Sequence, residues 1–164
     1  MAGKPKKGNQ RVTVRKAKSE DADELATLFY ETVHAINKKD YTEEQIQAWA
    51  PHVWTAEETA ERQKDHLTWV AVAKDHIVGF VELKASGYID CFYCHKDFQR
   101  QGIGSLLFNA IEVTAEKKQI RTLFADVSIT AKPFFLQLGF MVLEEQNVVR
   151  NEVSLPHFRM ELVL

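Results

Sequence analysis

Hydrophobic residues alternate with polar ones in several segments of this chain, and in others they recur every three to four positions. Alternation over a few residues predicts a strand that is buried on one face, whereas the three-to-four spacing predicts an amphipathic helix. The predicted strands span residues 11–17, 67–73, 77–83, 88–94, 122–127, 140–143 with a continuation at 148–149, and 158–164.

The predicted helices have recognisable ends. Ser19 precedes an acidic first turn and an apolar face, so a helix is expected to begin there. Two capping boxes, at 42–45 and 55–58, predict short helices that end before residue 51 and near residue 65. A last short helix, 131–138, is closed by Gly139. The longest helix, from 103 to about 118, has one face made of Ile103, Leu106, Leu107, Ala110, Ile111 and Thr114.

The order of these elements predicts the fold class. Strands joined by tight turns pair antiparallel, and a strand–helix–strand unit brings two strands parallel. We therefore expect an α+β fold with a mixed, mostly antiparallel central sheet of six to seven strands and helices on both faces. The order is not the strict strand–helix repeat of a doubly wound nucleotide fold. Residues 11–164 are predicted to form this single domain, and residues 1–10 a disordered basic tail.

Composition agrees with one globular domain. The chain has 164 residues, of which 45% are hydrophobic and 27% charged. No apolar run approaches the roughly 18 residues that cross a bilayer, and no apolar stretch follows the basic residues at the N-terminus. We therefore expect a cytoplasmic protein with no membrane partner, acting as a monomer or homodimer.

Charge is unevenly distributed along the chain. Residues 1–18 hold seven Lys or Arg and no acid, which leaves 14 basic against 23 acidic residues in the rest. A basic tail can contact nucleic acid, but this one has no aromatic residue and precedes an acidic body. We therefore expect no nucleic-acid partner, and a cationic substrate such as an amine.

The two cysteines, Cys91 and Cys94, superficially suggest a redox or metal pair. Within a strand, however, residues three apart project from opposite faces. No second cysteine pair exists to complete a zinc site. We therefore expect two buried, inert thiols and no metal site.

A glycine-containing turn, residues 99–105, joins the strand at 88–94 to the longest helix. The first N–H groups of a helix have no partner within it and lie at the positive end of its dipole, so this turn predicts an anion site. Gly102 and Gly104 allow a phosphate to approach the backbone, and Arg100 adds a cation. The motif is neither G-x-G-x-x-G nor a P-loop. A plain tight turn that starts a core helix is the alternative.

The segment Q-R-Q-G-I-G resembles the pyrophosphate-binding signature of the GNAT N-acetyltransferases. Downstream, A-K-P-F-F-L-Q-L-G-F is similar to that family's A-x-x-F-Y-x-x-x-G-F, and upstream G-Y-I-D-C-F-Y-C is similar to its Y-I-D-x-L-Y-V. The resemblance covers roughly residues 12–164 and is strongest to the YafP-type branch. It implies a GNAT fold and an acetyl-CoA-dependent transfer of an acetyl group to a primary amine of a small molecule or peptide.

The resemblance also implies roles for particular residues. Main-chain groups of Phe92 and Cys94 would pair with the pantetheine arm of acetyl-CoA and receive the acetyl carbonyl. Thr130 takes the place of a common Asn, and Phe135 that of a common Tyr. The cofactor-binding residues implied are Phe92, Tyr93, Cys94, Arg100, Gln101, Gly102, Ile103, Gly104, Ser105, Thr130 and Phe135.

The departure at Phe135 bears on the reaction. In many relatives the Tyr hydroxyl protonates the departing thiolate, and a phenyl ring cannot. A thiol has a pKa of about 8.5, so its thiolate is a tolerable leaving group. Loss of positioned proton transfer, typically worth about 10²–10⁴-fold, should slow the reaction without abolishing it. Alternatively, another group such as Tyr93 or Tyr30 donates this proton, and the choice stays open.

Direct attack by a neutral amine calls for a base, because an amine with a pKa near 10 is mostly protonated at pH 7. Glu82 and Asp90, on neighbouring predicted strands, are the candidate catalytic bases; each is otherwise a structural or solvent-facing carboxylate. Tyr30, His34 and Trp49 are the candidate acceptor-pocket residues, with core packing as the alternative for the tryptophan. The alternative function is a non-catalytic acyl-CoA-binding regulatory module, which Phe135 keeps open.

Overall fold

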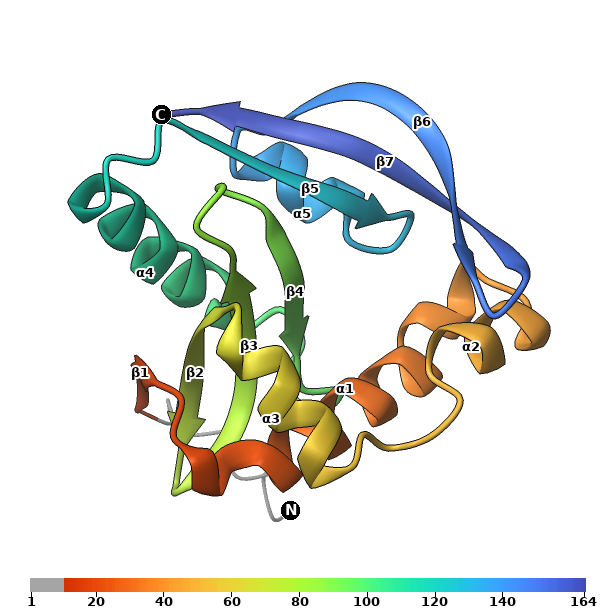
Figure 1. Ribbon diagram of the computed structural model, residues 1–164, viewed down its shortest axis with the longest axis horizontal. Helices are drawn as coiled ribbons and strands as arrows, with labels where there is room; N and C mark the ends of the chain where they lie inside the picture. The colour runs from red at the N-terminus through yellow and green to blue at the C-terminus, as the bar shows by residue number, and fades with distance from the viewer. Residues whose placement is uncertain (1–10) are drawn as a thin grey trace, which may run out of the picture.

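The computed structural model describes residues 11–164, and the predicted basic tail, residues 1–10, lies outside them (Figure 1). One sheet has four antiparallel strands in the order β1-β2-β3-β4. A second sheet has three antiparallel strands in the order β5-β7-β6. The strands are β1 Val12–Lys16, β2 Leu67–Ala73, β3 His76–Leu83, β4 Ile89–Cys94, β5 Thr122–Ser128, β6 Met141–Arg150 and β7 Val153–Val163.

The two sheets touch where β4 and β5 begin. The carbonyl of Gly87 accepts a hydrogen bond from the amide of Phe124 at 3.1 Å, and Tyr88 forms an isolated parallel bridge with Phe124. From this seam the two strands diverge, as the ribbon shows (Figure 1). The predicted fold class is confirmed, with seven strands among residues 11–164. The parallel pairing expected of the strand–helix–strand unit is limited to this seam.

Helices cover both faces. Helix α4 (Ile103–Lys117) and helix α5 (Lys132–Gln137) contribute Leu107, Ile111 and Phe135 to one buried core. Helices α1 (Ala22–Ala35) and α2 (Glu43–Trp49) contribute to a second core on the other side, and α3 (Ala56–Lys64) packs on α1. Strand β4 separates the two cores, because Cys94 packs against the first and Cys91 belongs to the second.

The local signals give the correct elements with some corrections. Both capping boxes form, at Thr42 and Thr55. The helix expected from Ser19 begins with a 3₁₀ turn before α1, because the Asp21 side chain is held by Arg15 and by the Lys18 amide.

Two other expectations change. Leu106 does not belong to the buried face of α4, since it is 43% exposed while Phe108 is buried. Strand β6 runs unbroken through its polar middle, 144–147, because it pairs with β7 along most of its length. No helix within residues 11–164 has both the length and the apolar character needed to cross a membrane.

Candidate functional site

Beyond the seam β4 and β5 diverge, and we call this divergence of the two strands the opening (Figure 1). The edge of β4 that faces it presents main-chain groups that β3 does not use. The amide of His95 donates to the Val78 carbonyl of the β3 strand at 2.8 Å. Successive residues of a strand direct their N–H and C=O groups to opposite sides. Phe92 lies three positions before His95, and Cys94 lies one position before it. The main-chain N–H and C=O groups of both residues therefore point away from β3. These are the two residues whose main-chain groups were predicted to meet the pantetheine arm.

One of these groups already has partners. The Cys94 carbonyl accepts from the Gln99 side-chain amide at 2.7 Å and from the Thr32 hydroxyl at 3.3 Å. Gln99 thereby ties the glycine turn to the end of β4. The remaining groups, both of Phe92 and the amide of Cys94, bond to no side chain within residues 11–164 and suit a linear amide-bearing ligand.

The glycine turn leads directly into α4, as predicted. Gly102 precedes the helix with φ +79°, a left-handed conformation that glycine adopts without strain, and no side chain caps the helix. A Cβ added at Gly102 would meet no atom within 4 Å. The first amides of this 15-residue helix thus have no side-chain cap, and the space beside Gly102 is free, as a pyrophosphate would require.

Gly104 has a different function from the one predicted. A Cβ there would lie 2.7 Å from the ring of Phe134 in α5, so the absent side chain makes room for that ring and not for a phosphate. The expectation that both glycines admit a phosphate is corrected: the free space lies at Gly102. Gly104 still belongs to the first turn of α4, where its amide was predicted to bind.

Phe135 lies in the aromatic core beneath the opening. It is 4% exposed, and its ring centroid lies 5.0 Å from that of Phe140 and 5.8 Å from that of Phe92. It can shape the floor of the opening, but it carries no proton. Thr130 lies near the end of β5, where its hydroxyl donates to the Asp40 carboxylate at 2.8 Å. Its predicted contact with the cofactor stays a prediction.

Glu82 and Asp90, the predicted bases, lie together in a charged cluster with two residues that the sequence analysis missed. Arg62 donates to Glu82 at 2.6 Å and to Asp90 at 3.3 Å. The Nε2 atom of His66 lies 2.8 Å from Asp90, and its Nδ1 atom faces the Arg62 carbonyl. Glu82 is 3% exposed. Both carboxylates are therefore already paired.

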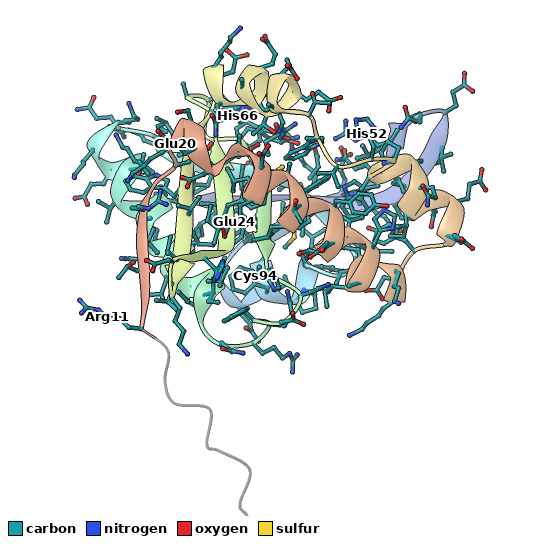
Figure 2. All side chains as sticks on the ribbon, turned by 90° about the horizontal axis from the view of Figure 1, so that it is seen from below. Arg11, Glu20, Glu24, His52, His66 and Cys94 are labelled. Atoms are coloured by element: carbon teal, nitrogen blue, oxygen red, sulfur yellow. The ribbon has the colours of Figure 1, made fainter. Side chains whose placement is uncertain are left out.

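A bulge in β4 brings Asp90 into this cluster. Glu82 pairs with Cys91 and Leu83 with Ile89, which leaves Asp90 as an extra residue. Its side chain thus reaches the same Arg62 as Glu82. His66, Glu82 and Asp90 could together hold a metal ion, but the Arg62 guanidinium already supplies a cation there. Figure 2 shows His66 beside α3, at the opposite end of β4 from Cys94.

The neighbouring charges and burial shift the ionisation of this region. Burial by itself lowers the pKa of a guanidinium, but Cys91 and the two carboxylates raise the pKa of Arg62 above its usual value. Burial raises the pKa of the Cys91 thiol well above its usual value, and that of Cys94 to about 11. Burial also raises the pKa of the Tyr93 hydroxyl, which therefore keeps its proton at neutral pH. Cys91 is buried, whereas Cys94 is partly buried and not buried as expected, and the raised pKa disfavours the reactive thiolate in both.

The predicted acceptor-pocket residues separate into two groups. Tyr30 and His34 stack on each other, with ring centroids 4.1 Å apart, and His34 bonds to the Ala50 carbonyl, so they join α1 to the end of α2. Trp49 instead faces β7, 5.4 Å from the ring of His157 and 5.2 Å from that of Tyr41.

Tyr41 fixes the aromatic group at the mouth of the opening. Its hydroxyl donates to the Pro156 carbonyl at 2.6 Å and accepts from the Ile129 amide at 2.9 Å, which joins β7 to the end of β5. Trp49 also lies close enough to the hydroxyl of Tyr93 on β4 to lower its pKa, against the effect of burial. An aromatic wall made of Tyr93, Trp49, Tyr41 and His157 therefore spans from β4 to β7.

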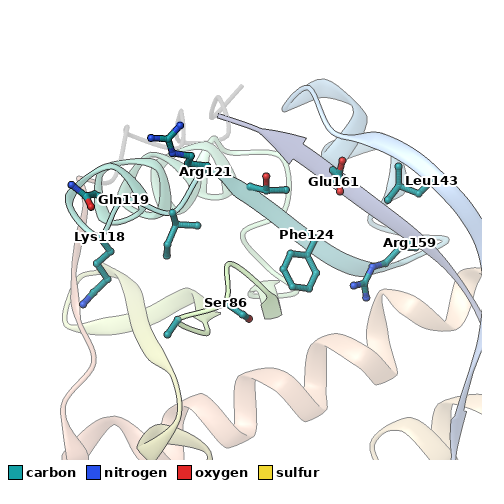
Figure 3. A pocket seen from close by; sticks show the side chains of 11 residues that line it. Ser86, Lys118, Gln119, Arg121, Phe124, Leu143, Arg159 and Glu161 are labelled. Atoms are coloured by element: carbon teal, nitrogen blue, oxygen red, sulfur yellow. The ribbon is translucent and has the colours of Figure 1, made fainter.

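The same face of the second sheet continues into a cavity of about 620 Å³ that none of the predicted residues lines (Figure 3). Arg159, two residues beyond His157 on β7, lines it and lies 4.7 Å from the Phe124 ring. Asp126 pairs with Arg159 at 3.2 Å and accepts from the Tyr88 hydroxyl at 2.8 Å. These contacts keep the pKa of Asp126 below its usual value even though burial opposes them.

Sequence reasoning missed Arg62, His66 and His157. Arg62 and His66 stand four residues apart at the end of a helix that was read as merely polar, and that spacing was the available signal. His157 follows Pro156 in the last strand without any motif. Its neighbours are far away in the sequence, so nothing local could have found it.

Comparisons with known proteins agree with this geometry. The family model of the acetyltransferase (GNAT) domain matches residues 37–164. The uncharacterized N-acetyltransferase YafP of Escherichia coli (strain K12) is 30% identical over 139 residues, 84% of this chain and 86% of the relative. A GCN5-related N-acetyltransferase structure from Rhodopseudomonas palustris has a TM-score of 0.88 and 30% identity, covering 93% and 95% of the two chains. The PaiA N-acetyltransferase of Thermoplasma acidophilum, solved with coenzyme A, has a TM-score of 0.77 and 23% identity, covering 94% and 99%.

Proposed function

Because this chain belongs to the GNAT acetyltransferase family, we propose that it transfers the acetyl group of acetyl-CoA to a primary amine of a small molecule or peptide. The observation that carries the proposal is the row of free main-chain groups along β4 that leads to the uncapped N-terminus of α4. Such a row suits a ligand with an amide-bearing arm at one end and a diphosphate at the other.

Each part of the opening has a task in this proposal. The amides of residues 100–105 hold the pyrophosphate, and Phe92 and Cys94 align the pantetheine arm. Acetyl-CoA supplies a thioester, whose carbonyl oxygen is stabilised by a main-chain amide near Phe92 as negative charge develops. Positioning of the amine beside the thioester supplies much of the rate.

The proton steps are assigned in part. The thiolate can leave without an acid, since its pKa of about 8.5 is close to neutral pH. Tyr93 and Tyr30 stay the alternative donors in place of the hydroxyl absent at Phe135; burial keeps the Tyr93 hydroxyl protonated but also makes it a weaker acid. Glu82 and Asp90 stay predicted bases, although their pairing with Arg62 weakens both for this role.

The test is a panel of primary amines, incubated with the protein and acetyl-CoA while thiol release is followed. We expect turnover with at least one amine and a ternary-complex kinetic pattern. Tight acetyl-CoA binding by calorimetry without turnover on any amine would favour the non-catalytic module. Absence of acetyl-CoA binding would refute both functions.

A further inference from the structure

His157 of β7 has the features of a proton acceptor, and neither the sequence motifs nor the family match points to it. It pairs with Ser128, the last residue of β5, and therefore lies one strand away from the edge of β5 that diverges from β4. The ring centroid of Trp49 lies 5.4 Å from that of His157, and Trp49 also lies close enough to the Tyr93 hydroxyl of β4 to lower its pKa. One aromatic side chain, Trp49, thus lies between the imidazole of His157 and β4, the strand that carries the predicted thioester site.

Its hydrogen bonding leaves one nitrogen unused. The Nδ1 atom lies 3.1 Å from the Leu155 carbonyl, and a carbonyl only accepts, so the proton of the neutral ring is on Nδ1. Nε2 is therefore the basic atom, and it bonds to nothing within residues 11–164. Nε2 is not among the fully buried, unpartnered side-chain atoms of residues 11–164, which belong to Arg62, Gln63, Thr68 and Trp69.

The surroundings keep the ring neutral at physiological pH. The side chain of His157 is 6% exposed, and burial lowers its pKa below the usual value. The Leu155 hydrogen bond and the charge of Asp126 oppose this shift, and Arg150 adds to it. The remaining neighbours, Tyr41 and Trp49, carry no charge. By contrast, Glu82 and Asp90 have their charge compensated by Arg62.

We propose that His157 is the catalytic base, and that its Nε2 atom takes the proton of the acceptor amine. The proposal rests on the acetyl transfer proposed above. An ammonium loses one proton to Nε2, the N–C bond forms as the C–S bond breaks, and the amide nitrogen loses its second proton. The thiolate of coenzyme A takes one proton, so one is released to solvent for each acetyl group transferred. The aromatic wall around His157 also suits a cationic amine before it is deprotonated.

Two variants test the role of Nε2. His157→Asn keeps an N–H in place of Nδ1 for the Leu155 carbonyl and removes the basic nitrogen; His157→Gln places an amide near Nε2. With an alkylamine acceptor, we expect kcat to fall about 10²–10⁴-fold in both. With an arylamine, which is already neutral at pH 7, we expect less than about a tenfold loss. His52→Gln, an exposed histidine paired with Glu58, is the matched control and should act as wild type.

The pH profile supplies a second readout. In the wild type, kcat/KM should fall as pH drops through the lowered pKa of His157, below about 6.5, and this acidic limb should vanish in His157→Asn. Equal losses for alkylamine and arylamine, or a retained acidic limb, would show that His157 is only structural. Wild-type turnover by His157→Asn would overturn the proposal outright.

A measurement without substrate separates this proposal from the proposed function. In ¹⁵N-labelled protein, the nitrogen shifts of His157 at pH 7 should report a neutral ring protonated on Nδ1. The imidazolium form, or a proton on Nε2, would overturn the assignment of the base even if amines are acetylated. The expected tautomer without turnover on any amine would instead refute the acetyl transfer, and with it the step assigned to His157.

Discussion

A negative charge placed at residue 102 should remove coenzyme A from the glycine turn. Gly102→Glu and Gly102→Gln introduce side chains of the same length into space that no protein atom occupies within 4 Å. Both variants carry the same backbone strain, because φ is +79° there, and each should lose about 1–2 kcal/mol of folding free energy. The two variants therefore differ only in charge.

The magnitude follows from the electrostatics of the turn. A carboxylate 4 Å from one phosphate charge costs about 4 kcal/mol at an effective dielectric constant of 20, and about 1 kcal/mol in bulk water. The turn opens to solvent on one side, so about 2 kcal/mol is the reasonable value. We therefore expect Gly102→Glu to bind coenzyme A about 30-fold more weakly than Gly102→Gln.

Calorimetry with two ligands checks the reasoning. Coenzyme A carries the diphosphate, whereas pantetheine lacks it and should bind both variants equally. The difference for coenzyme A should shrink as salt is added, because the charges are near the surface. If the two variants bind coenzyme A within threefold of each other at low salt, the amides of this turn do not hold the pyrophosphate.

Three further predictions concern the scaffold. Gly87→Ala should lower the free energy of unfolding by about 3 kcal/mol, because φ is +94° there and the new Cβ would lie 2.2 Å from the Thr122 carbonyl. The control Gly139→Ala has a similar φ of +98° but its nearest neighbour lies 3.6 Å away, so it should lose only about 1 kcal/mol. Equal losses of the two variants in denaturant titrations would contradict a tight seam. Glu82→Gln should cost about 3 kcal/mol in the same assay, because Arg62 loses its shortest partner; a cost below about 0.5 kcal/mol would mean that the pair does not form in solution. Cys94 has a pKa of about 11 against the usual 9.0. At pH 8 it should therefore be alkylated about 100-fold more slowly in the native than in the unfolded chain, which peptide mass spectrometry would show. Equal rates in the two states would refute its burial.

Local chemistry was enough to predict most elements of this fold. The capping boxes at Thr42 and Thr55 and the glycine at 139 act within a few residues, so their signals survive in the sequence. The divergence of β4 from β5 leaves no such signal in the sequence, because it depends on how two sheets pack. The role of Gly104 was misread for the same reason: the ring that needs its missing Cβ lies thirty residues further along the chain.

The candidate site shows this limit more sharply. Glu82 and Asp90 were chosen because they are carboxylates on the strands nearest the cofactor. The residue that neutralises both, Arg62, comes from a helix with no sequence link to them. Sequence indicates which groups can accept a proton, but only the contacts show which group is still free to do so.

The arrangement around β4 separates binding from chemistry. In the proposed function its free edge holds the linear part of acetyl-CoA, and its bulge places Asp90 in a charged cluster with Arg62 that connects α3 to the sheet. The nitrogen that we propose as proton acceptor, Nε2 of His157, has no hydrogen-bond partner within residues 11–164 and lies across the opening, on β7. Because β5 and β7 form a separate sheet joined to β4 at a single seam, a small movement at Gly87 changes the distance from His157 to the thioester. Gly87→Ala should therefore lower kcat more than it weakens coenzyme A binding, and the opposite result would place the proton acceptor on the β4 side.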